Sequence, residues 1–431
     1  MTIEDIKRLN YIKYTSCREL VHNPHDLLYC VCRFFLSVFK SVLYWETGDL
    51  TMKEILFVVP TLNNQKSVKN IVDNLPEGKS TIWGADMSKW MPYLQVRLMS
   101  LIYLHLFIKL YMISSRDDKA LMRFYYEDFI TTCATYKVLE KTLLKNSQLK
   151  MVVMANDHVI ITRSLIELTE RLHVKSLYVQ HASVTTAFPP LRFDYAFLDG
   201  LESYEKYKAV GNMRGHIFLS GSPRFDVFCY NRGGKRQYSV GIALNELDSE
   251  EKALKLCLYI KRHYSDKIIV RPHPGMLNPR NLLFHKEMFL ENGFDISNPY
   301  KDLSNVFLSD IKVMVANESG IHLDAALMGV PSILYNFSNN EVMDWYSYIK
   351  KGLVKKCDTF EDIIKMLNST YKTPENAIRY YAASFKTSVD GKIGEMIAKF
   401  VHKEVFESEE AAFEYIYALM INRKEYVEYK S

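Results

Sequence analysis

Three short stretches combine residue types that can bind or transform a charged substrate. They read Tyr178-Val179-Gln180-His181-Ala182, Arg271-Pro272-His273-Pro274-Gly275 and Ala316-Asn317-Glu318-Ser319-Gly320. Each follows an apolar, β-branched run, which indicates the carboxyl end of a strand. In open α/β sheets, ligand sites gather at such strand ends. We therefore expect the three stretches to line one cleft.

The second and third stretches are suited to binding a phosphate. Two prolines restrict the backbone around His273, so that its imidazole is held rigidly beyond a strand. Arg271 and His273 can neutralise the charge that develops on a diphosphate or a leaving phosphate. The segment Asn317 to Gly320 offers backbone N–H groups at a helix N-terminus to an anion, or Glu318 to a ribose. A purely structural His273 is the alternative.

Polar residues also end strands in the first half of the chain. Asn156 and Asp157 follow the apolar run at 151–154, and Asp157 is a candidate general base. The alternative is that one of them only caps the following helix. His181, next to Gln180, ends another strand, where contact with a ligand competes with a satisfied structural role.

A third group of polar residues ends the first half of the chain. The sequence Ser220-Gly221-Ser222-Pro223-Arg224-Phe225-Asp226 places an arginine and an aspartate two residues apart. Arg224 can bind a phosphate or an acidic sugar, and Asp226 can act as a nucleophile or base. Alternatively, the two side chains form a pair that only fixes the turn.

The elements that position these residues alternate between strand and helix, which predicts parallel sheets with right-handed crossovers. A polar, glycine-containing linker at 231–236 separates two such series. The predicted fold class is α/β, with two Rossmann-type domains facing a cleft and additional helices at both ends. The predicted regions are a helical segment 1–50, a first Rossmann-type domain 51–232 with a helical insertion at about 85–145, a second Rossmann-type domain 237–400 and a helical tail 401–431.

Composition excludes several classes of protein. A chain of 431 residues suggests two domains, and its 48% hydrophobic and 24% charged residues are those of a globular protein. The 55 basic and 50 acidic residues are too balanced for a dedicated nucleic-acid binder. The seven cysteines lack the paired spacing of a zinc site. We therefore expect a cytoplasmic protein without a metal or a nucleic-acid partner.

Two apolar stretches, 27–45 and 94–113, are about long enough to span a bilayer. Each contains basic residues, such as Arg33 and Lys109, which argue against spanning. A buried or half-buried helix is the favoured interpretation, and an amphipathic helix at a membrane surface is the alternative. The first residues lack the features of a secretory signal.

Together these motifs resemble GT-B-type transferases of bacterial surface polysaccharides. Similar elements occur in CDP-glycerol glycerophosphotransferases, polysialyltransferases and β-Kdo transferases, which use cytidine-nucleotide donors. The stretches 178–184, 188–191 and 195–200 most resemble the retaining β-Kdo transferase group. The resemblance covers about residues 150–340.

The resemblance implies roles for the residues in these motifs. The residues expected to face the nucleotide donor are Arg271, His273, Asn317, Glu318, Ser319 and Gly320. Those expected to face the transferred group or the acceptor are Asp157, His181 and Asp226, with Asn156, Gln180 and Arg224 binding substrate. Retaining transfer of Kdo needs a carboxylate nucleophile, and Asp226 and Asp157 are the candidates. Many relatives have two serines where this chain has Glu318-Ser319.

The resemblance predicts a transferase that moves a sugar, with Kdo preferred, from a CMP-linked donor to a lipid-linked or growing glycan. No cofactor is expected beyond the CMP- or CDP-linked donor itself, and peripheral contact with the inner membrane is an option. The alternatives are a CDP-glycerol or CDP-ribitol phosphotransferase, an enzyme like the UDP-GlcNAc 2-epimerases, and a nucleotide-binding subunit without turnover.

Overall fold

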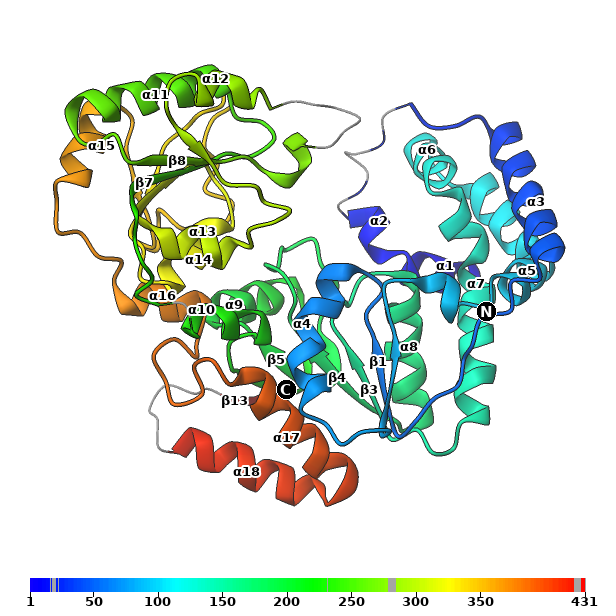
Figure 1. Cartoon of the computed structure of the whole chain (residues 1–431). Coiled ribbons are helices and arrows are strands. Elements are labelled where there is room, and N and C mark those ends of the chain that lie inside the picture. The colour runs from blue at the N-terminus through cyan, green and yellow to red at the C-terminus, as the bar shows by residue number, and fades with distance from the viewer. Residues whose placement is uncertain are drawn as a thin grey trace. The chain divides into compact units, whose positions relative to one another are not determined.

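The chain folds into two compact units, each built around one sheet (Figure 1). The computed structural model describes residues 1–15, 17, 21, 23–230, 232–277, 284–421 and 428–430. Unit 1 comprises Met1–Arg224 and Gly394–Ser431, and unit 2 comprises Phe225–Ile393. The predicted α/β class, with two Rossmann-type sheets and additional helices at both ends, is confirmed.

The sheet of unit 1 has the strand order β13-β6-β5-β4-β3-β1-β2. Its strands are β1 Ile55–Val58, β2 Ser80–Trp83, β3 Met151–Met154, β4 Lys175–Val179, β5 Arg192–Leu198, β6 Arg214–Leu219 and β13 Glu428–Lys430. All neighbours are parallel except β13, which runs antiparallel to β6. The order reverses between β1 and β3. This reversal is the topological switch point of unit 1.

Helices bury both faces of this sheet, which explains why β1 and β3 read as continuous apolar runs. The helices that follow its strands and end the chain are α4 Leu62–Asp73, α8 Ile160–Leu172, α9 Leu201–Val210, α17 Ile393–Phe406 and α18 Glu409–Ile421. Phe400 of α17 packs against the rings of Phe197 and Phe218, at centroid distances of 5.3 and 5.7 Å. These contacts attach the C-terminal helices to unit 1.

The remaining helices of unit 1 form a layer with a core of its own. They are α1 Ile3–Leu9, α2 Tyr11–Thr15, α3 Leu27–Tyr44, α5 Tyr93–Ile113, α6 Arg116–Phe124 and α7 Tyr126–Lys145. Phe34 of α3, Leu110 of α5 and Phe129 of α7 are buried in this core. However, only 22% of the most apolar window of α3, and of α5, is buried. Each helix therefore buries one side in this core and leaves the other side exposed, which agrees with the half-buried interpretation and not with complete burial.

The sheet of unit 2 has the order β12-β11-β10-β7-β8-β9, and all its neighbouring strands are parallel. The strands are β7 Tyr238–Ala243, β8 Ile268–Arg271, β9 Asp295–Ile296, β10 Ile311–Ala316, β11 Ser332–Leu334 and β12 Lys355–Lys356. The helices are α10 Asp226–Tyr230, α11 Glu250–His263, α12 Lys286–Leu290, α13 Ser304–Asp310, α14 Ile321–Leu327, α15 Phe360–Leu367 and α16 Glu375–Tyr381. The switch point of this sheet lies between β7 and β10.

The structure divides the chain at positions other than the predicted limits 51–232, 237–400 and 401–431. Unit 2 begins at Phe225, before the predicted linker, of which Asn231 lies outside the described residues. It ends at Ile393, so that the predicted limit at 400 falls inside α17. Within unit 2, Arg232 forms an ion pair with Asp390. This pair joins the two segments through which the chain enters and leaves the unit.

Gly241, in the central strand β7, allows α13 and β10 to approach closely. A Cβ atom there would lie 2.8 Å from Phe307 Cζ and 2.7 Å from Ile311 Cδ1. We expect Gly241→Ala to lower the free energy of unfolding by about 1–3 kcal/mol, because the packed core must shift. Urea unfolding measures the loss. Gly320→Ala is the control, because a Cβ there meets nothing within 4 Å. Equal losses of stability in both variants would contradict the close packing around Gly241.

Candidate functional site

Asp248 joins the two loops at the switch point of unit 2. Its Oδ1 accepts a hydrogen bond of 2.7 Å from Asn317 Nδ2, beyond β10, and its Oδ2 accepts one of 2.8 Å from Asn245 N–H, beyond β7. Burial raises the pKa of Asp248, and these hydrogen bonds oppose the rise. The sequence analysis missed Asp248, although an acidic residue soon after an apolar strand is the signal that could have found it.

Asn317 organises the turn that follows β10. Its Oδ1 accepts the Glu318 N–H at 2.8 Å, and its carbonyl oxygen lies 3.0 Å from His322 Nε2. His322 is completely buried, and burial lowers its pKa to about 4. The imidazole is therefore neutral at pH 7 and donates its Nε2–H to Asn317. These bonds commit Asn317 to positioning the turn, whereas the sequence analysis assigned it to the donor.

Glu318 holds the loop 336–345 against the same edge of the sheet. Its carboxylate accepts hydrogen bonds from Met343 N–H, at 3.2 Å, and from Trp345 N–H. The indole of Trp345 is 72% exposed. Ser319 is half-buried and Gly320 is exposed beyond it. Of the predicted donor residues in this turn, Glu318 orders a loop, whereas Ser319 and Gly320 are accessible at the edge.

His273 has the environment of a residue that transfers a proton or binds a phosphate. Its Nδ1 lies 3.0 Å from Glu246 Oε1, and half of the side chain is exposed. Gly275 N–H approaches the same nitrogen at 3.1 Å, so Nδ1 accepts or donates according to the proton it carries. A Cβ at position 275 would lie 1.6 Å from Glu246 Oε1, so glycine permits this approach. Nε2 has no hydrogen-bond partner among the described residues. Glu246, beyond β7, was missed by the sequence analysis.

Arg271 does not share this environment. It is the last residue of β8, and its guanidinium donates to Ser297 Oγ and to the Asp302 carbonyl, both at 2.8 Å. The side chain is buried, and burial lowers its pKa. Because strand side chains point to the faces of a sheet, Arg271 is directed to a neighbouring loop and not beyond the strand end. Its contacts favour a structural role over the predicted contact with the nucleotide.

The switch point of unit 1 contains a cavity of about 540 Å³. Its wall is largely apolar, with contributions from Met87, Met91 and Val96 and from Val159 to Ile161. Arg97 and Glu127 add an ion pair of 3.2 Å. Residues beyond β1 and β3 thus meet α5 and α7 around one space. The sequence analysis did not anticipate this cavity, because α5 comes from the helical insertion.

Asp157 and His158 form a hydrogen-bonded pair in the loop between β3 and α8, directly before Val159, which lines the cavity. Asp157 is 1% exposed, and its Oδ1 lies 2.9 Å from His158 Nδ1. Its Oδ2 accepts a hydrogen bond of 2.7 Å from the Tyr207 hydroxyl. Asn156 Oδ1 accepts the N–H groups of His158 and Val159, both at 3.0 Å, so that it fixes the turn that leads into α8. The more accessible group of the pair is His158, which the sequence analysis did not select.

Gln180 and His181 have different environments. Gln180 is buried, donates to Ala182 O at 2.9 Å and to Ser203 Oγ at 2.8 Å, and accepts Asp199 N–H at 2.9 Å. Its amide is therefore occupied by the chain itself. His181 is half-buried, and its Nδ1 has no hydrogen-bond partner in the part of the chain that the structure describes. Burial, and then the neighbouring His158, lowers its pKa to about 4.

Arg224 and Asp226 have separate partners. Arg224 Nη2 pairs with Asp199 Oδ2 at 2.8 Å within unit 1. Burial raises the pKa of Asp199 to about 6, and Arg224 opposes the rise. Asp226 is buried in unit 2, where its Oδ1 accepts the Ile393 N–H at 2.9 Å. This environment favours a structural anchor over the predicted nucleophile or base.

Arg163, on α8, is a buried polar residue that was not predicted from the sequence. It is 6% exposed, and its Nε has no hydrogen-bond partner among the residues that the structure describes. Nothing in the sequence distinguishes it from a surface arginine of a helix. Within the part of the chain that the structure describes, no group of three or more His, Cys, Asp or Glu residues could hold a metal ion.

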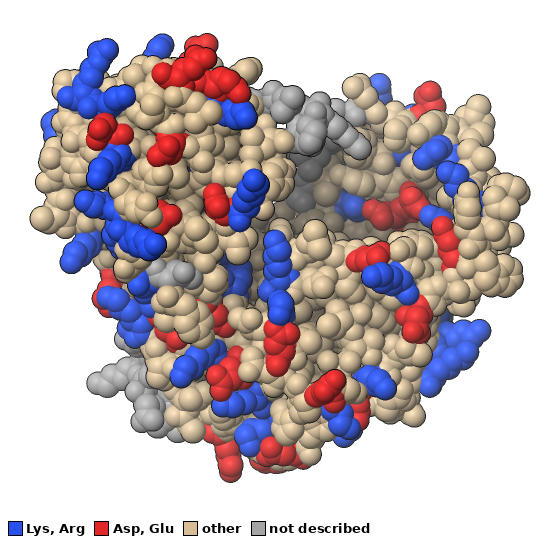
Figure 2. Space-filling model, in the orientation of Figure 1, with Lys and Arg blue, Asp and Glu red and all other residues tan. Residues whose placement is uncertain are grey.

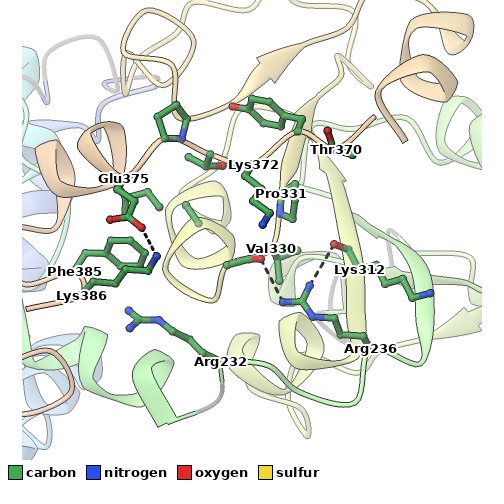
Figure 3. A pocket seen from close by; sticks show the side chains of 16 residues that line it. Arg232, Arg236, Lys312, Val330, Pro331, Thr370, Lys372, Glu375, Phe385 and Lys386 are labelled. Carbon is green, nitrogen blue, oxygen red and sulfur yellow. Dashed lines mark hydrogen bonds and ion pairs between the residues drawn. The ribbon is translucent and has the colours of Figure 1, made fainter. Parts of the chain in front are cut away.

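A larger cavity of about 810 Å³ lies at the opposite, amino-terminal edge of the unit 2 sheet (Figure 3). Its basic residues are Arg232, Arg236, Lys312, Lys372 and Lys386. Several are already engaged, since Arg236 donates to the carbonyls of Lys312 and Gly329, and Lys386 pairs with Glu375. Ligands of such sheets bind beyond the carboxyl ends of the strands. The other edge, around His273, is therefore the better candidate for a ligand site.

The predicted residues thus gather at two carboxyl edges. His273, Ser319 and Gly320 lie at the edge of the unit 2 sheet, and Asp157 and His181 at that of the unit 1 sheet. A single cleft that combines both edges stays a prediction.

Comparison with known proteins supports the fold. No family model and no curated protein sequence matches this chain. A crystal structure of UDP-N-acetylglucosamine 2-epimerase has a TM-score of 0.51 at 12% identity, covering 84% of this chain and 98% of that one. A Neisseria meningitidis UDP-GlcNAc 2-epimerase bound to UDP-GlcNAc reaches 0.49 at 12% identity, covering 81% and 98%. The wall teichoic acid polymerase TagF reaches 0.46 at 11%, covering 89% and 99%. The similarity to the first of these structures, with its TM-score of 0.51, shows that the chain has a GT-B-like fold.

The buried His322 makes the stability of the protein sensitive to acid. Its pKa of about 4 in the folded chain lies below the ordinary 6.5, so only the unfolded chain binds a proton between these values. This stabilisation is complete above pH 6.5 and is lost as the pH falls. We expect the wild type to lose about 2 kcal/mol more than His322→Gln between pH 7.5 and pH 5. Urea unfolding at both pH values measures the difference.

His285→Gln is the control for this comparison, because its imidazole is exposed. It should show the acid sensitivity of the wild type. Parallel losses in the wild type and in His322→Gln would contradict the role of His322.

Proposed function

We propose that the protein is a transferase that moves a group from a cytidine-nucleotide donor to a lipid-linked or growing surface glycan on the cytoplasmic side of the membrane. The transferred group is a sugar, with Kdo preferred, or alternatively a polyol phosphate. One observation carries this proposal. Each sheet has, beyond the carboxyl ends of its strands, a histidine oriented by a carboxylate, His273 with Glu246 and His158 with Asp157.

The donor belongs to unit 2 in this proposal. The exposed Nε2 of His273 binds a donor phosphate and neutralises it as it leaves. Ser319 and Gly320 supply polar and backbone contacts at the same edge. Trp345, held by Glu318, offers an exposed aromatic surface on which a pyrimidine base stacks. The choice of cytidine comes from the sequence resemblance.

The acceptor belongs to unit 1. The apolar cavity between β1 and β3 suits the lipid-proximal part of an acceptor, and His158 takes the proton of its attacking hydroxyl. Asp157 acts through His158, because its own oxygens are engaged and buried. The acceptor oxygen then forms the new bond, while the bond to the nucleotide phosphate breaks. The burial of Asp157 and Asp226 supports this direct transfer over a covalent intermediate on either residue.

Nucleotide binding and product analysis together test the proposal. Cytidine nucleotides should raise the melting temperature, whereas UDP and GDP should not, because a ligand that binds only the folded state stabilises it. Mass spectrometry then distinguishes a glycoside formed from CMP-Kdo from a phosphodiester formed from CDP-glycerol. Isomerisation of UDP-GlcNAc without an acceptor would instead identify an epimerase. Binding without any turnover would identify a nucleotide-binding subunit.

Replacing His273 tests the donor side directly. We expect His273→Ala to lower turnover about 100-fold or more, because the leaving phosphate loses the proton or the positive charge that the imidazole supplies. The melting temperature should not change, since the side chain is half exposed. His285→Ala, an exposed histidine of the same unit, should retain full activity. Full activity of His273→Ala would rule out the assignment.

Replacing Trp345 tests the proposed base platform. We expect Trp345→Ala to weaken cytidine-nucleotide binding by about tenfold, because an aromatic stacking contact is lost. Isothermal titration calorimetry measures the change. Trp45→Ala removes an equally exposed tryptophan from unit 1 and should leave the affinity unchanged. Equal affinities of all three proteins would place the base elsewhere.

A further inference from the structure

The helices α3 and α5 expose a continuous apolar surface on unit 1, which we call the α3/α5 face. The two helices pack against each other, and Figure 1 shows α3 at the outer side of the helical layer. Phe39 on α3 is 64% exposed and Met112 on α5 is 71% exposed. Other large exposed side chains of these helices include Leu28, Leu36, Leu43, Ile102 and Ile113. Apolar patches of this extent mark interaction sites.

The packing of these helices excludes a membrane span. Both helices are long and apolar enough to cross a bilayer. However, Phe34 and Val38 on α3, and Phe107 and Leu110 on α5, are buried in the core of the helical layer. The two helices therefore lie along the surface of a folded unit. Only their outer sides are available to an apolar phase.

The charge of the α3/α5 face identifies its partner. Neither helix contains an aspartate or a glutamate, whereas Arg33, Lys40 and Lys109 are basic and exposed. In Figure 2 the right-hand edge of unit 1, where Figure 1 shows α3, is mostly free of red acidic atoms. A surface that is both apolar and purely basic complements a bilayer with negatively charged headgroups. A docking site for another protein would not need both exposed apolar side chains and exclusively basic charges along two helices.

We propose that the α3/α5 face docks unit 1 onto an anionic lipid bilayer. The helices lie in the plane of the interface, their outer apolar side chains enter the boundary between headgroups and acyl chains, and Lys40 and Lys109 contact the phosphates. The exposed aromatic residues Tyr44 and Trp45 end α3, at positions suited to the headgroup level.

The same helix α5 connects this surface to the acceptor cavity. Tyr93, Val96 and Arg97 line the cavity of about 540 Å³, and Leu98, Leu101 and Ile102 follow them on the α3/α5 face. A lipid-linked acceptor thus reaches the cavity along α5 without leaving the membrane. This route rests on the proposed function, whereas the docking itself does not.

Vesicle sedimentation with the full chain tests the docking in the absence of nucleotide and acceptor. The wild type should bind vesicles of phosphatidylcholine mixed with phosphatidylglycerol, and bind pure phosphatidylcholine about tenfold or more weakly. The triple variant Leu36→Ser, Phe39→Ser, Leu43→Ser should lose about tenfold or more of its binding to the mixed vesicles. The double variant Lys40→Glu, Lys109→Glu should lose the preference for the anionic lipid.

A matched variant in unit 2 controls for general changes in hydrophobicity. Leu290→Ser, Leu303→Ser, Val306→Ser replaces three other exposed apolar side chains and should bind like the wild type. Unchanged melting temperatures confirm that all variants fold. The proposal is overturned if the wild type binds neither vesicle, or if the two triple variants bind equally. It is also overturned if light scattering shows that the α3/α5 face holds two copies together and vesicles do not compete.

Discussion

The organisation of this protein depends on one constraint, that parallel sheets covered by helices on both faces leave polar groups only at the strand ends. The strands β1, β3 and β8 are completely buried, so none of their side chains can meet a solvated ligand along the strand. Polar side chains that must reach a substrate therefore collect in the loops beyond the strands. The reversal of strand order in each sheet decides where those loops separate enough to admit a ligand.

The carboxyl edges of the two sheets differ in the side chains that surround their candidate sites. In unit 2 polar contacts hold the loops: Asp248 accepts from Asn317, Asn317 accepts from the Glu318 N–H, and the Glu318 carboxylate accepts from the Met343 N–H. His273, paired with Glu246, stays half exposed beside them. In unit 1 the walls are apolar and come largely from helices. The first arrangement suits a phosphate-bearing nucleotide, and the second suits an acceptor with a lipid. The proposed division between donor and acceptor follows from this difference.

Several polar residues at these edges act as supports for their neighbours. Gln180 and Arg271 direct their side-chain hydrogen bonds to other parts of the chain, and Asp157 is buried and hydrogen-bonded to His158. A buried amide or guanidinium without a hydrogen-bond partner costs free energy of folding. Buried polar groups such as these are therefore hydrogen-bonded within the chain and are not available to a ligand. Exposure and orientation, which are not properties of residue type, therefore separate the candidate catalytic groups from their supports.

The sequence by itself determined the α/β class, most of the parallel strands and the segments at their carboxyl ends, because apolar runs and turn residues are local signals. It did not reveal β2, an edge strand without a continuous apolar run, or the attachment of α17 and α18 to unit 1. It selected His273, an accessible group, but it could not separate it from the buried Arg271, and it selected the buried Asp157 and not its more accessible neighbour His158. Only the tertiary structure decided these points, because burial, pairing and the outer face of α3 and α5 depend on contacts between residues that are distant in the chain.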